Sequence, residues 1–302
     1  MQYEKIYLKE GRPDVYLETY ISDSLPNVTR KAILVIPGGG YGGVCADREG
    51  EPIALAFLPY GYNGFVLHYT VGRKEAYPAQ LREVTMAIKH IKDNAEKYGI
   101  DPDQLFVTGF SAGGHLTACA GVFWNRPEAT EGLDIPYGYN KPRGIMPIYP
   151  VISMKGHGFS IKNLLCKDDP TKEETDYVSV DQHVTADSSP VFIVHSADDE
   201  LVDARNSLDF AMAYANAGVE YELHIFPHAQ HGCALGNAIT DMGNPNWNDP
   251  MIARWVEMAA YWAEKLCKYP SFCLPQRGRG TARRRWMRRA AYRLPFGCPL
   301  LW

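Results

Sequence analysis

Residues 105–114 read LFVTGFSAGG, and this stretch decides the fold. Its first four residues are mostly apolar or β-branched and predict a buried strand, whereas the small residues after Ser111 predict a helix that continues through Ala120. Between them, residues 109–113 match the pattern G-x-S-x-G, in which a sharp strand-to-helix turn holds a serine in strained backbone geometry. We therefore predict that Ser111 is a nucleophile at the carboxyl edge of a sheet, with the positive end of the following helix beneath it.

Strand and helix patterns alternate on both sides of this turn, from residue 30 to residue 266. The other predicted strands cover 32–36, 64–69, 144–152, 190–196 and 220–226, and the other predicted helices cover 51–60, 78–99, 204–217 and 251–267. Such alternation is typical of a mostly parallel sheet with helices on both faces. The predicted fold class is α/β.

A serine hydroxyl needs a general base, and the base needs an acid that orients it, so both are sought downstream of Ser111. The predicted strand at 190–196 is followed by Asp198, Asp199 and Glu200, and a carboxylate placed there can reach over the sheet edge. We favour Asp199, because Asp198 is better suited to be solvated or to cap the next helix. The three acids remain alternatives at this point.

Two histidines after the last predicted strand are candidates for the base. His231 is preferred, because Gly232 after it lets the backbone turn tightly and leaves the imidazole free to face Ser111. His228 is interpreted as a structural or rim residue. The expected catalytic residues are therefore Ser111, His231 and Asp199.

A glycine-rich loop, PGGGYGG at residues 37–43, follows the first central strand. Glycines leave backbone N–H groups accessible, and such groups can stabilise the negative charge that develops on a carbonyl oxygen during acyl transfer. The N–H groups of Gly39 and Gly40, together with that of Ala112, are predicted to form an oxyanion hole.

Two side chains near the same edge are expected to contact substrate. Tyr41 belongs to the glycine-rich loop, and His68 ends the strand predicted at 64–69. A glycine-rich loop after a strand could instead hold phosphate groups, but the chain has no G-K-[ST] motif. Nucleotide binding is set aside, because the serine, acid and histidine already account for this edge of the sheet.

Charge is distributed unevenly along the chain. Residues 270–302 contain eight arginines and no Asp or Glu, whereas the remainder has 23 basic and 35 acidic residues and a net charge of −12. A body this acidic is poorly suited to nucleic-acid binding, which needs a basic face. We interpret residues 270–302 as a disordered or non-native extension; the alternative is an anion-binding or membrane-surface arm.

The 302-residue chain has the composition of an ordinary globular protein, with 46% hydrophobic and 22% charged residues. No stretch reaches the roughly 18 unbroken apolar residues of a membrane span, and the first residues lack the order of a signal peptide. The seven cysteines include no C-x-x-C pair, so they predict neither a disulfide framework nor a zinc site. We expect a cytoplasmic protein without a membrane partner, with a catalytic domain over 1–269 and a lid or insertion over the polar stretch 154–189.

These motifs resemble the α/β-hydrolase superfamily, and within it the bacterial esterases related to acetylxylan esterases and the hormone-sensitive-lipase-like group. The resemblance covers residues 30–266 and rests on residues 37–41, 77–79, 98–102, 109–115, 198–199 and 231–232. The lipase-like group usually has a histidine before the three glycines, where this chain has Pro37. That departure favours the carbohydrate-esterase-like branch.

The resemblance implies an α/β-hydrolase fold without a metal or organic cofactor, and it implies the same roles for Ser111, His231 and Asp199 as the search by chemistry. It also implies a serine carboxylesterase that hydrolyses short acyl esters, particularly acetyl esters of plant-cell-wall sugars such as xylan. The expected partner is a small-molecule or oligosaccharide ester. The alternatives are a peptidase or arylformamidase with the same machinery, and a hydrolase-fold protein that binds without catalysis.

Overall fold

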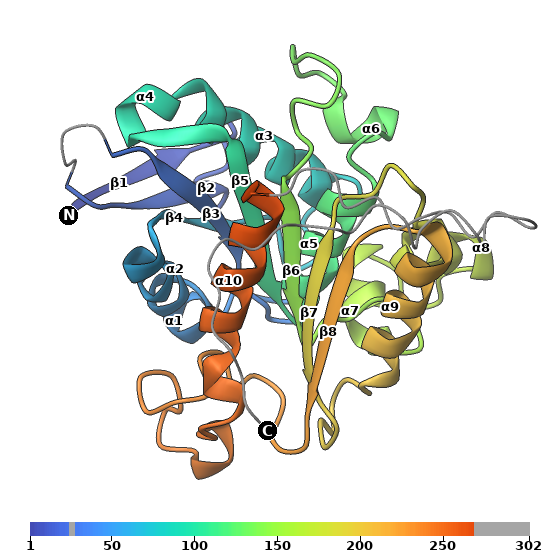
Figure 1. Ribbon diagram of the computed structural model, residues 1–302. Helices are drawn as coiled ribbons and strands as arrows, with labels where there is room; N and C mark the ends of the chain where they lie inside the picture. Colours follow the sequence, from blue (N-terminus) through green and yellow to red (C-terminus); the bar gives the residue numbers. More distant parts are fainter. Residues whose placement is uncertain (24–27, 269–302) are drawn as a thin grey trace, which may run out of the picture.

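The computed structural model describes residues 1–23 and 28–268; the arginine-rich stretch at 270–302 lies outside them. The strands of the described residues form one sheet in the order β1-β2-β4-β3-β5-β6-β7-β8 (Figure 1). In chain order they are β1 (Gln2–Tyr7), β2 (Tyr16–Ile21), β3 (Arg30–Ile36), β4 (Tyr62–His68), β5 (Ile100–Phe110), β6 (Gly144–Ile148), β7 (Val191–Ser196) and β8 (Tyr221–Phe226). Strands β3 to β8 run parallel to one another, whereas β2 pairs antiparallel with β4 and β1 pairs antiparallel with β2.

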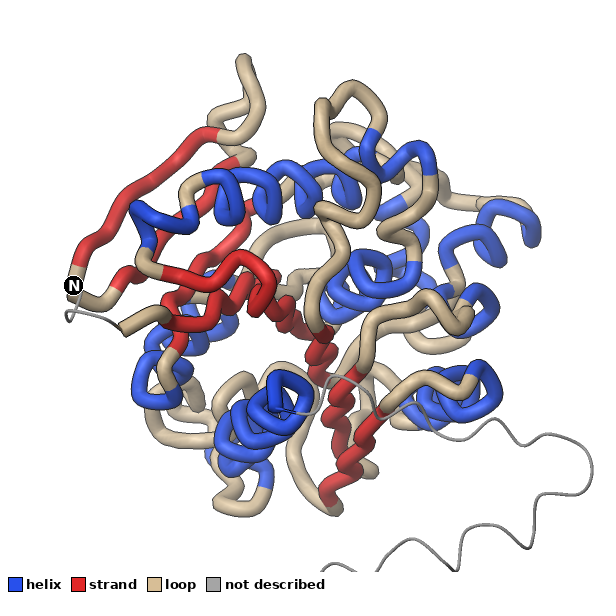
Figure 2. The backbone as a smooth tube through the Cα atoms, turned by 45° about the horizontal axis from the view of Figure 1, so that its top comes forward, coloured by secondary structure: helices blue, strands red, loops and turns tan. Residues whose placement is uncertain are grey.

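Helices cover both faces of the sheet (Figure 2). The α-helices are α1 (Ala46–Glu49), α2 (Glu51–Phe57), α3 (Ala79–Asp93), α4 (Ala95–Tyr98), α5 (Ala112–Val122), α6 (Pro127–Thr130), α7 (Gly158–Leu164), α8 (Lys172–Val178), α9 (Arg205–Ala217) and α10 (Trp255–Lys268), and the 3₁₀ helices are η1 (Leu58–Tyr60), η2 (Val180–His183), η3 (Pro245–Trp247) and η4 (Ile252–Arg254). Buried side chains of α3, α5, α7 and α9 belong to one core cluster, and those of α2 and α10 belong to the other. The sheet therefore separates two apolar layers.

The two layers explain why the central strands are apolar without alternation. In β5, Leu105 and Val107 pack into the layer of α3 and α5, while Phe106 and Phe110 pack into the layer of α2 and α10. All four are fully buried. A parallel strand with a helical layer on each face needs apolar side chains at every position, so it reads as a continuous apolar run.

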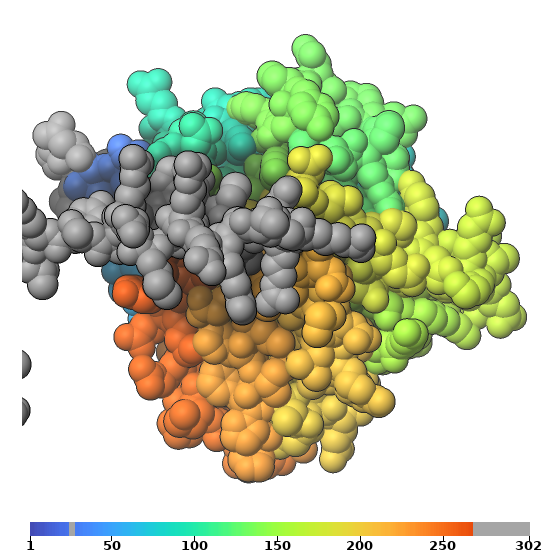
Figure 3. Space-filling view, turned by 45° about the vertical axis from the view of Figure 1, so that its right-hand side comes forward, coloured from blue at the N-terminus to red at the C-terminus, as the bar shows by residue number. Residues whose placement is uncertain are grey.

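The carboxyl ends of the parallel strands meet at one edge of the sheet, which is the lower edge in Figure 1. The register pairs Ile36 of β3 with Gly109 of β5, and Phe110 of β5 with Ile148 of β6. The loops after β3, β5, β7 and β8 therefore emerge side by side. In the space-filling view, the later part of the chain, coloured yellow to orange, makes up the lower part of the visible face (Figure 3).

The structure differs from the sequence-based expectations in several elements. The antiparallel strands β1 and β2 were not predicted, and the helix predicted over 78–99 is divided at Asn94 into α3 and α4. The strand predicted over 144–152 ends at Ile148, because Tyr149 has a positive φ of 35° and Pro150 follows. The polar stretch 154–189, for which no helical period was apparent, contains α7, α8 and η2.

Candidate active site

Ser111 lies in the tight turn between β5 and α5. Its backbone has φ 53° and ψ −116°, a strained combination for a residue with a side chain. A Cβ on Gly109 would lie 2.3 Å from Thr117 Oγ1, and one on Gly113 would lie 2.1 Å from the carbonyl oxygen of Ile36. The G-x-S-x-G spacing is thus a packing requirement, because only glycine lets α5 approach β3 and β5 this closely.

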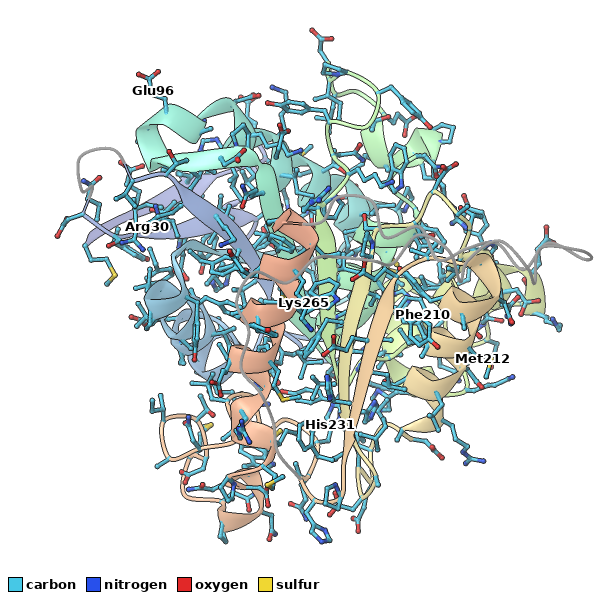
Figure 4. All side chains as sticks on the ribbon, viewed as in Figure 1. Arg30, Glu96, Phe210, Met212, His231 and Lys265 are labelled. Atoms are coloured by element: carbon cyan, nitrogen blue, oxygen red, sulfur yellow. The ribbon has the colours of Figure 1, made fainter. Side chains whose placement is uncertain are left out.

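The structure brings together the three side chains that the sequence analysis selected for catalysis. His231, in the loop after β8, places Nε2 2.8 Å from Ser111 Oγ. On the other side of the imidazole, Nδ1 is 2.7 Å from Oδ2 of Asp199, which follows β7. Figure 4 shows His231 beside the lower part of the sheet. A hydroxyl, an imidazole and a carboxylate therefore form one hydrogen-bonded series.

Asp199 is held rigidly and stays ionised. Its side chain is 1% exposed, and Oδ1 accepts hydrogen bonds from the N–H groups of Leu201 (3.0 Å) and Val202 (2.9 Å). Burial by itself would raise the pKa of Asp199, but contacts with His195 and His231 outweigh it and hold the pKa well below the usual value. An ionised acid at this position can orient His231 and stabilise its protonated form.

Asp198 contacts the loop after β8 at residues other than His231. Its Oδ1 accepts the N–H of Ala229 (2.9 Å), and its Oδ2 lies 3.2 Å from Nδ1 of His228. Both side chains are substantially exposed, at 44% for Asp198 and 77% for His228. Asp198 is thus partly solvated, in agreement with one of the two expectations, and in addition it fastens the loop that carries His231; His228 lies at the rim, as expected.

The glycine-rich loop lies directly against Ser111. A Cβ on Gly38 would be 2.7 Å from the carbonyl oxygen of Phe110 and 3.0 Å from Ser111 Cβ. Gly39 and Gly40 have φ of 125° and 63°, and within the described residues neither N–H has a backbone or side-chain acceptor. Ala112 is the first residue of α5, where an N–H has no acceptor within the helix. These three N–H groups are available to bind an anionic oxygen.

The structure does not place Tyr41 in a position to contact substrate, contrary to our expectation. Tyr41 is only 1% exposed, and its hydroxyl is 2.8 Å from Nδ1 of His115. Its ring makes an edge contact with that of Tyr69. Because the ring is enclosed by its neighbours, Tyr41 supports the glycine-rich loop from within the core.

His68 is likewise held by residues of the neighbouring strand β2. Its Nε2 is 3.1 Å from Glu18 Oε2, and its ring stacks on that of Tyr16 with 4.0 Å between the centroids. Burial lowers the pKa of His68. His68 therefore ends β4, as expected. Its hydrogen bond and its ring contact, however, are with residues of β2 and not with the catalytic loops.

Two buried residues that the sequence analysis missed join the loops of the site. Glu49 in α1 is 2% exposed; it accepts the N–H of Gly38 (2.8 Å) and the hydroxyl of Tyr149 (2.9 Å). The Tyr149 hydroxyl accepts the N–H of Ala234 (3.0 Å), and its ring lies edge-on to that of His231, with centroids 4.9 Å apart. Burial raises the pKa of Glu49. No motif in the sequence marks either residue.

Helix α7, from the polar stretch 154–189, covers the other side of the glycine-rich loop. Asn163 donates from Nδ2 to the carbonyl oxygen of Gly40 (2.9 Å) and accepts at Oδ1 from Nε of Arg73 (3.1 Å). Phe159 lies beside the loop, since a Cβ on Gly40 would be 3.4 Å from its ring, and it is 60% exposed. An exposed aromatic ring therefore borders the group of free N–H donors.

Neither a metal cluster nor a membrane-spanning helix occurs in the described part of the chain. Residues 1–23 and 28–268 contain no group of three His, Cys, Asp or Glu side chains arranged to hold a metal ion. Over the same residues, no helix combines the length and the apolar character that crossing a bilayer requires.

Comparison with known proteins places the chain in a family. An acetyl ester-xyloside bifunctional hydrolase from Caldicellulosiruptor lactoaceticus is similar in structure, with a TM-score of 0.74 and 32% identity over 87% of this chain and 96% of that one. The sequence model of the BD-FAE family matches residues 14–214. The chain belongs to the BD-FAE family.

This BD-FAE chain has the α/β-hydrolase fold. It is similar to MGS-M1, an α/β-hydrolase enzyme from a deep-sea metagenome library of the Medee basin, with a TM-score of 0.72 and 30% identity over 89% of this chain and 98% of that one. The parallel sheet with helices on both faces agrees with that assignment. The fold and family suggested by the sequence resemblance are confirmed.

Curated relatives of the BD-FAE chain include named carbohydrate-active enzymes. Endo-1,4-beta-xylanase B of Butyrivibrio fibrisolvens is 35% identical over 70% of this chain and 34% of its own length. Acetylxylan esterase of Xylanibacter ruminicola is 29% identical over 72% of this chain and 45% of its own length. The chain thus spans less than half the length of these relatives, and it shares its family with carboxylic ester hydrolases.

Proposed function

We propose that this protein is a serine carboxylesterase that hydrolyses short-chain acyl esters, with acetylated xylan or xylo-oligosaccharides as its substrates. The observation that carries the proposal is the contact of Ser111 Oγ with His231 Nε2 at 2.8 Å, in series with the contact of His231 Nδ1 with Asp199 at 2.7 Å. This is the arrangement that makes a serine hydroxyl nucleophilic at neutral pH.

The reaction proceeds in two steps on these groups. His231 Nε2 takes the proton of Ser111 while Oγ attacks the ester carbonyl, and Asp199 stabilises the imidazolium that forms. His231 then gives the proton to the departing alcohol, which leaves the acyl group bound to Ser111. Water, deprotonated by the same imidazole, releases the acid and restores Ser111.

The developing oxyanion binds to backbone N–H groups. Those of Gly39, Gly40 and Ala112 are unpaired within the described residues, and the loop that carries the two glycines adjoins Ser111 through Gly38. Donors that are already oriented need no reorganisation when charge develops, so they stabilise the transition state more than the substrate. No cofactor takes part in this scheme.

The choice of substrate rests on two supports. Acetylxylan esterase and the acetyl ester-xyloside hydrolase are among the similar proteins, which favours acetylated sugars. Phe159 of α7 lies beside Gly40, which favours a short acyl group because the ring takes up space next to the oxyanion donors. From the contact of Phe159 with the glycine-rich loop we also propose that residues 154–189 form a lid over the site. This lid would belong to a catalytic domain at residues 1–269.

A substrate panel tests the proposal. We expect kcat/KM to be highest for acetyl esters and to fall by about tenfold or more between 4-nitrophenyl acetate and the octanoate, since each surplus methylene must be accommodated beside Phe159. Acetylated xylo-oligosaccharides, acetyl anilides and N-formyl anilines are measured alongside. Faster turnover of the anilide would indicate a peptidase instead, and faster turnover of the formyl compound would indicate an arylformamidase. Failure of a fluorophosphonate to label Ser111 would indicate a binding protein without catalysis.

Replacing Tyr149 by phenylalanine tests the buried connection between the loops. The variant keeps the ring against His231 but leaves the Glu49 carboxylate and the N–H of Ala234 without their shared partner. We expect kcat for 4-nitrophenyl acetate to fall by about tenfold with KM within about twofold, and stability to fall by about 1–3 kcal/mol. Steady-state kinetics and urea unfolding measure the two effects.

Tyr214→Phe is the matched control for this variant. Tyr214 is also fully buried, and its hydroxyl donates one hydrogen bond to the carbonyl oxygen of Ser189 (3.0 Å), away from the catalytic loops. This control is expected to lose stability but to retain kcat. If Tyr149→Phe likewise lowers stability alone, the Tyr149 hydroxyl has no part in positioning His231.

A further inference from the structure

The position of the leaving alcohol follows from the proposed function, on which this inference rests. The proton that His231 Nε2 takes from Ser111 must pass to the alcohol oxygen as the ester bond breaks, so that oxygen must come within hydrogen-bond distance of Nε2. The rest of the alcohol then lies beside the histidine loop. Side chains that adjoin this loop on its open side determine which alcohols fit.

Two side chains, from separate parts of the chain, adjoin Gly232, the residue after His231. A Cβ on Gly232 would be 3.4 Å from Nη2 of Arg48 in α1 and 3.5 Å from Cζ2 of Trp247 in η3. Gly232 has a φ of 87°. The space beside the base that a side chain of residue 232 would fill is therefore bordered by a guanidinium group and an indole ring.

Arg48 is fixed in place but keeps hydrogen-bonding capacity. Its Nε donates to the carbonyl oxygen of Gly232 (3.2 Å), and its guanidinium carbon lies 5.0 Å from the centre of the Trp247 ring, within cation–π range. Within the described residues, the guanidinium group also forms a long ion pair of 3.8 Å with Asp47 and interacts with the Cys45 thiol and the Glu49 carboxyl group. The side chain is 19% exposed, so part of it faces solvent.

The opposite wall of the site carries side chains of other kinds, among them His157, whose Nδ1 is 2.8 Å from Ser160 Oγ. There, α7 presents the exposed ring of Phe159, and the amide of Asn163 is already bonded to Gly40 and Arg73. Arg48 is fixed against the histidine loop through its Nε, and its two terminal nitrogens carry further N–H groups. A planar guanidinium with two terminal nitrogens suits the oxygens of hydroxyl groups on neighbouring ring carbons, and an indole ring suits the apolar C–H face of the same ring.

We propose that Arg48 and Trp247 form the subsite for the leaving alcohol, and that this subsite recognises a pyranose ring with a free hydroxyl next to the esterified oxygen. The Arg48 terminal nitrogens donate to that hydroxyl while the ring rests against Trp247. Arg48 thereby distinguishes a sugar acetate from an acetate of a plain alcohol, and it acts on the bound substrate without entering the proton transfer.

A pair of simple esters isolates this interaction. Cyclohexyl acetate and trans-2-hydroxycyclohexyl acetate differ by one hydroxyl next to the ester, and the protein is expected to prefer the hydroxylated ester by about tenfold or more in kcat/KM, the scale of a hydrogen bond from a charged donor. In Arg48→Met the preference is expected to fall to within about twofold of unity; because the preference is a ratio of two kcat/KM values, a general loss of activity from the missing contact with Gly232 does not change it. Arg48→Lys should restore part of the preference, because lysine keeps the positive charge. The restoration should be incomplete, because lysine lacks the planar pair of terminal nitrogens.

Arg254→Met is the matched control, because Arg254 is 64% exposed and its ion pair is with Glu257 on the same helical segment. It should leave the preference intact. A preference that survives Arg48→Met, or an equal loss on both cyclohexyl esters, would overturn the subsite and leave the esterase proposal standing.

Xylobiose binding to Ser111→Ala, measured by calorimetry, distinguishes a failure of the subsite proposal from a failure of the proposed esterase function. Suppose that the wild type hydrolyses no ester, that xylobiose binds Ser111→Ala, and that adding Arg48→Met weakens this binding by about tenfold. The subsite proposal would then stand and the proposed function would be wrong. If xylobiose binding is absent or indifferent to Arg48, the subsite is wrong.

Discussion

Replacing Ser111 by alanine is expected to lower kcat/KM for 4-nitrophenyl acetate by about 10⁴- to 10⁶-fold, the scale seen when the nucleophile of a serine hydrolase is removed. The variant lacks the hydroxyl that lies 2.8 Å from His231 Nε2, so no acyl-enzyme can form. The oxyanion donors remain, and they should preserve a small residual rate over water. Initial rates at high enzyme concentration measure the loss.

The same variant should fold normally, which separates a catalytic effect from a structural one. The Ser111 N–H donates to the carbonyl oxygen of Ile148 (3.1 Å), and the Ser111 carbonyl accepts from the N–H groups of His115 and Val151. All three bonds belong to the backbone and survive the substitution, and alanine meets the same steric limits at this φ. The melting temperature should therefore change by no more than about 2 °C.

Ser188→Ala is the matched control for the loss of a serine hydroxyl. Ser188 is 4% exposed, and its Oγ accepts the N–H of Thr185 (3.1 Å) far along the chain from the catalytic turn. This variant is expected to keep its esterase activity and to react with a fluorophosphonate, whereas Ser111→Ala should not react. Retained turnover in Ser111→Ala would discard Ser111 as the nucleophile.

Replacing Asp199 by asparagine is expected to lower kcat by about 10³- to 10⁴-fold, the scale reported for the orienting acid of such a series. The asparagine oxygen can still accept the N–H groups of Leu201 and Val202, so the local fold is kept. Its amide nitrogen, however, would face His231 Nδ1 as a donor and favour the tautomer in which Nε2 carries the proton and cannot act as a base. Steady-state kinetics across pH 6–9 measure the effect.

Asp198→Asn provides the comparison at the adjacent position. Its oxygen can still accept the N–H of Ala229, and Asp198 has no contact with His231, so a loss of less than about fivefold is expected. Equal losses in the two variants would mean that the acid assignment is not resolved by these contacts, and a larger loss for Asp198→Asn would transfer the role to Asp198.

The lowered pKa of Asp199 also predicts a pH dependence of stability. A carboxyl whose pKa is lower in the folded than in the unfolded protein stabilises the fold above its unfolded pKa, near 4, and this contribution disappears as the pH falls through the folded value. The wild type should therefore lose more stability than Asp199→Asn between pH 5 and pH 2. Urea unfolding at each pH measures the difference.

The sequence predicted the core of the fold well, because the parallel strands carry a local signal. Most residues of strands β3 to β7 are buried between two helical layers, so each of these strands contains an apolar run that ends in glycine, proline or polar residues; the edge strand β8 is more exposed. Strands β1 and β2 carry no such signal. All residues of β1 are at least partly exposed, and β1 owes its strand conformation to pairing with β2, which in turn pairs with β4.

The expected catalytic residues could be selected because each follows a recognisable strand. Ser111 follows β5 and Asp199 and His231 follow β7 and β8, so the chemistry limited the choice to few candidates. Tyr41 and His68 were expected to contact substrate by the same reasoning, and it failed for them. Position at a sheet edge does not tell where a ring turns: the ring of Tyr41 is enclosed in the core beneath the glycine-rich loop, and the ring of His68 packs against β2.

By itself, the sequence determined the α/β class, the strand-to-helix turn at Ser111 and the short set of acids and bases, because these depend on local periodicity and on residues a few positions apart. Only the tertiary structure decided that Asp199 and not Asp198 meets His231, that Glu49 and Tyr149 join the glycine-rich loop to the histidine loop, and that Arg48 and Trp247 lie together beside Gly232. The physical reason is distance along the chain: these contacts join segments up to about two hundred residues apart, and such contacts form only when strand register and helix packing bring their loops to one edge of the sheet.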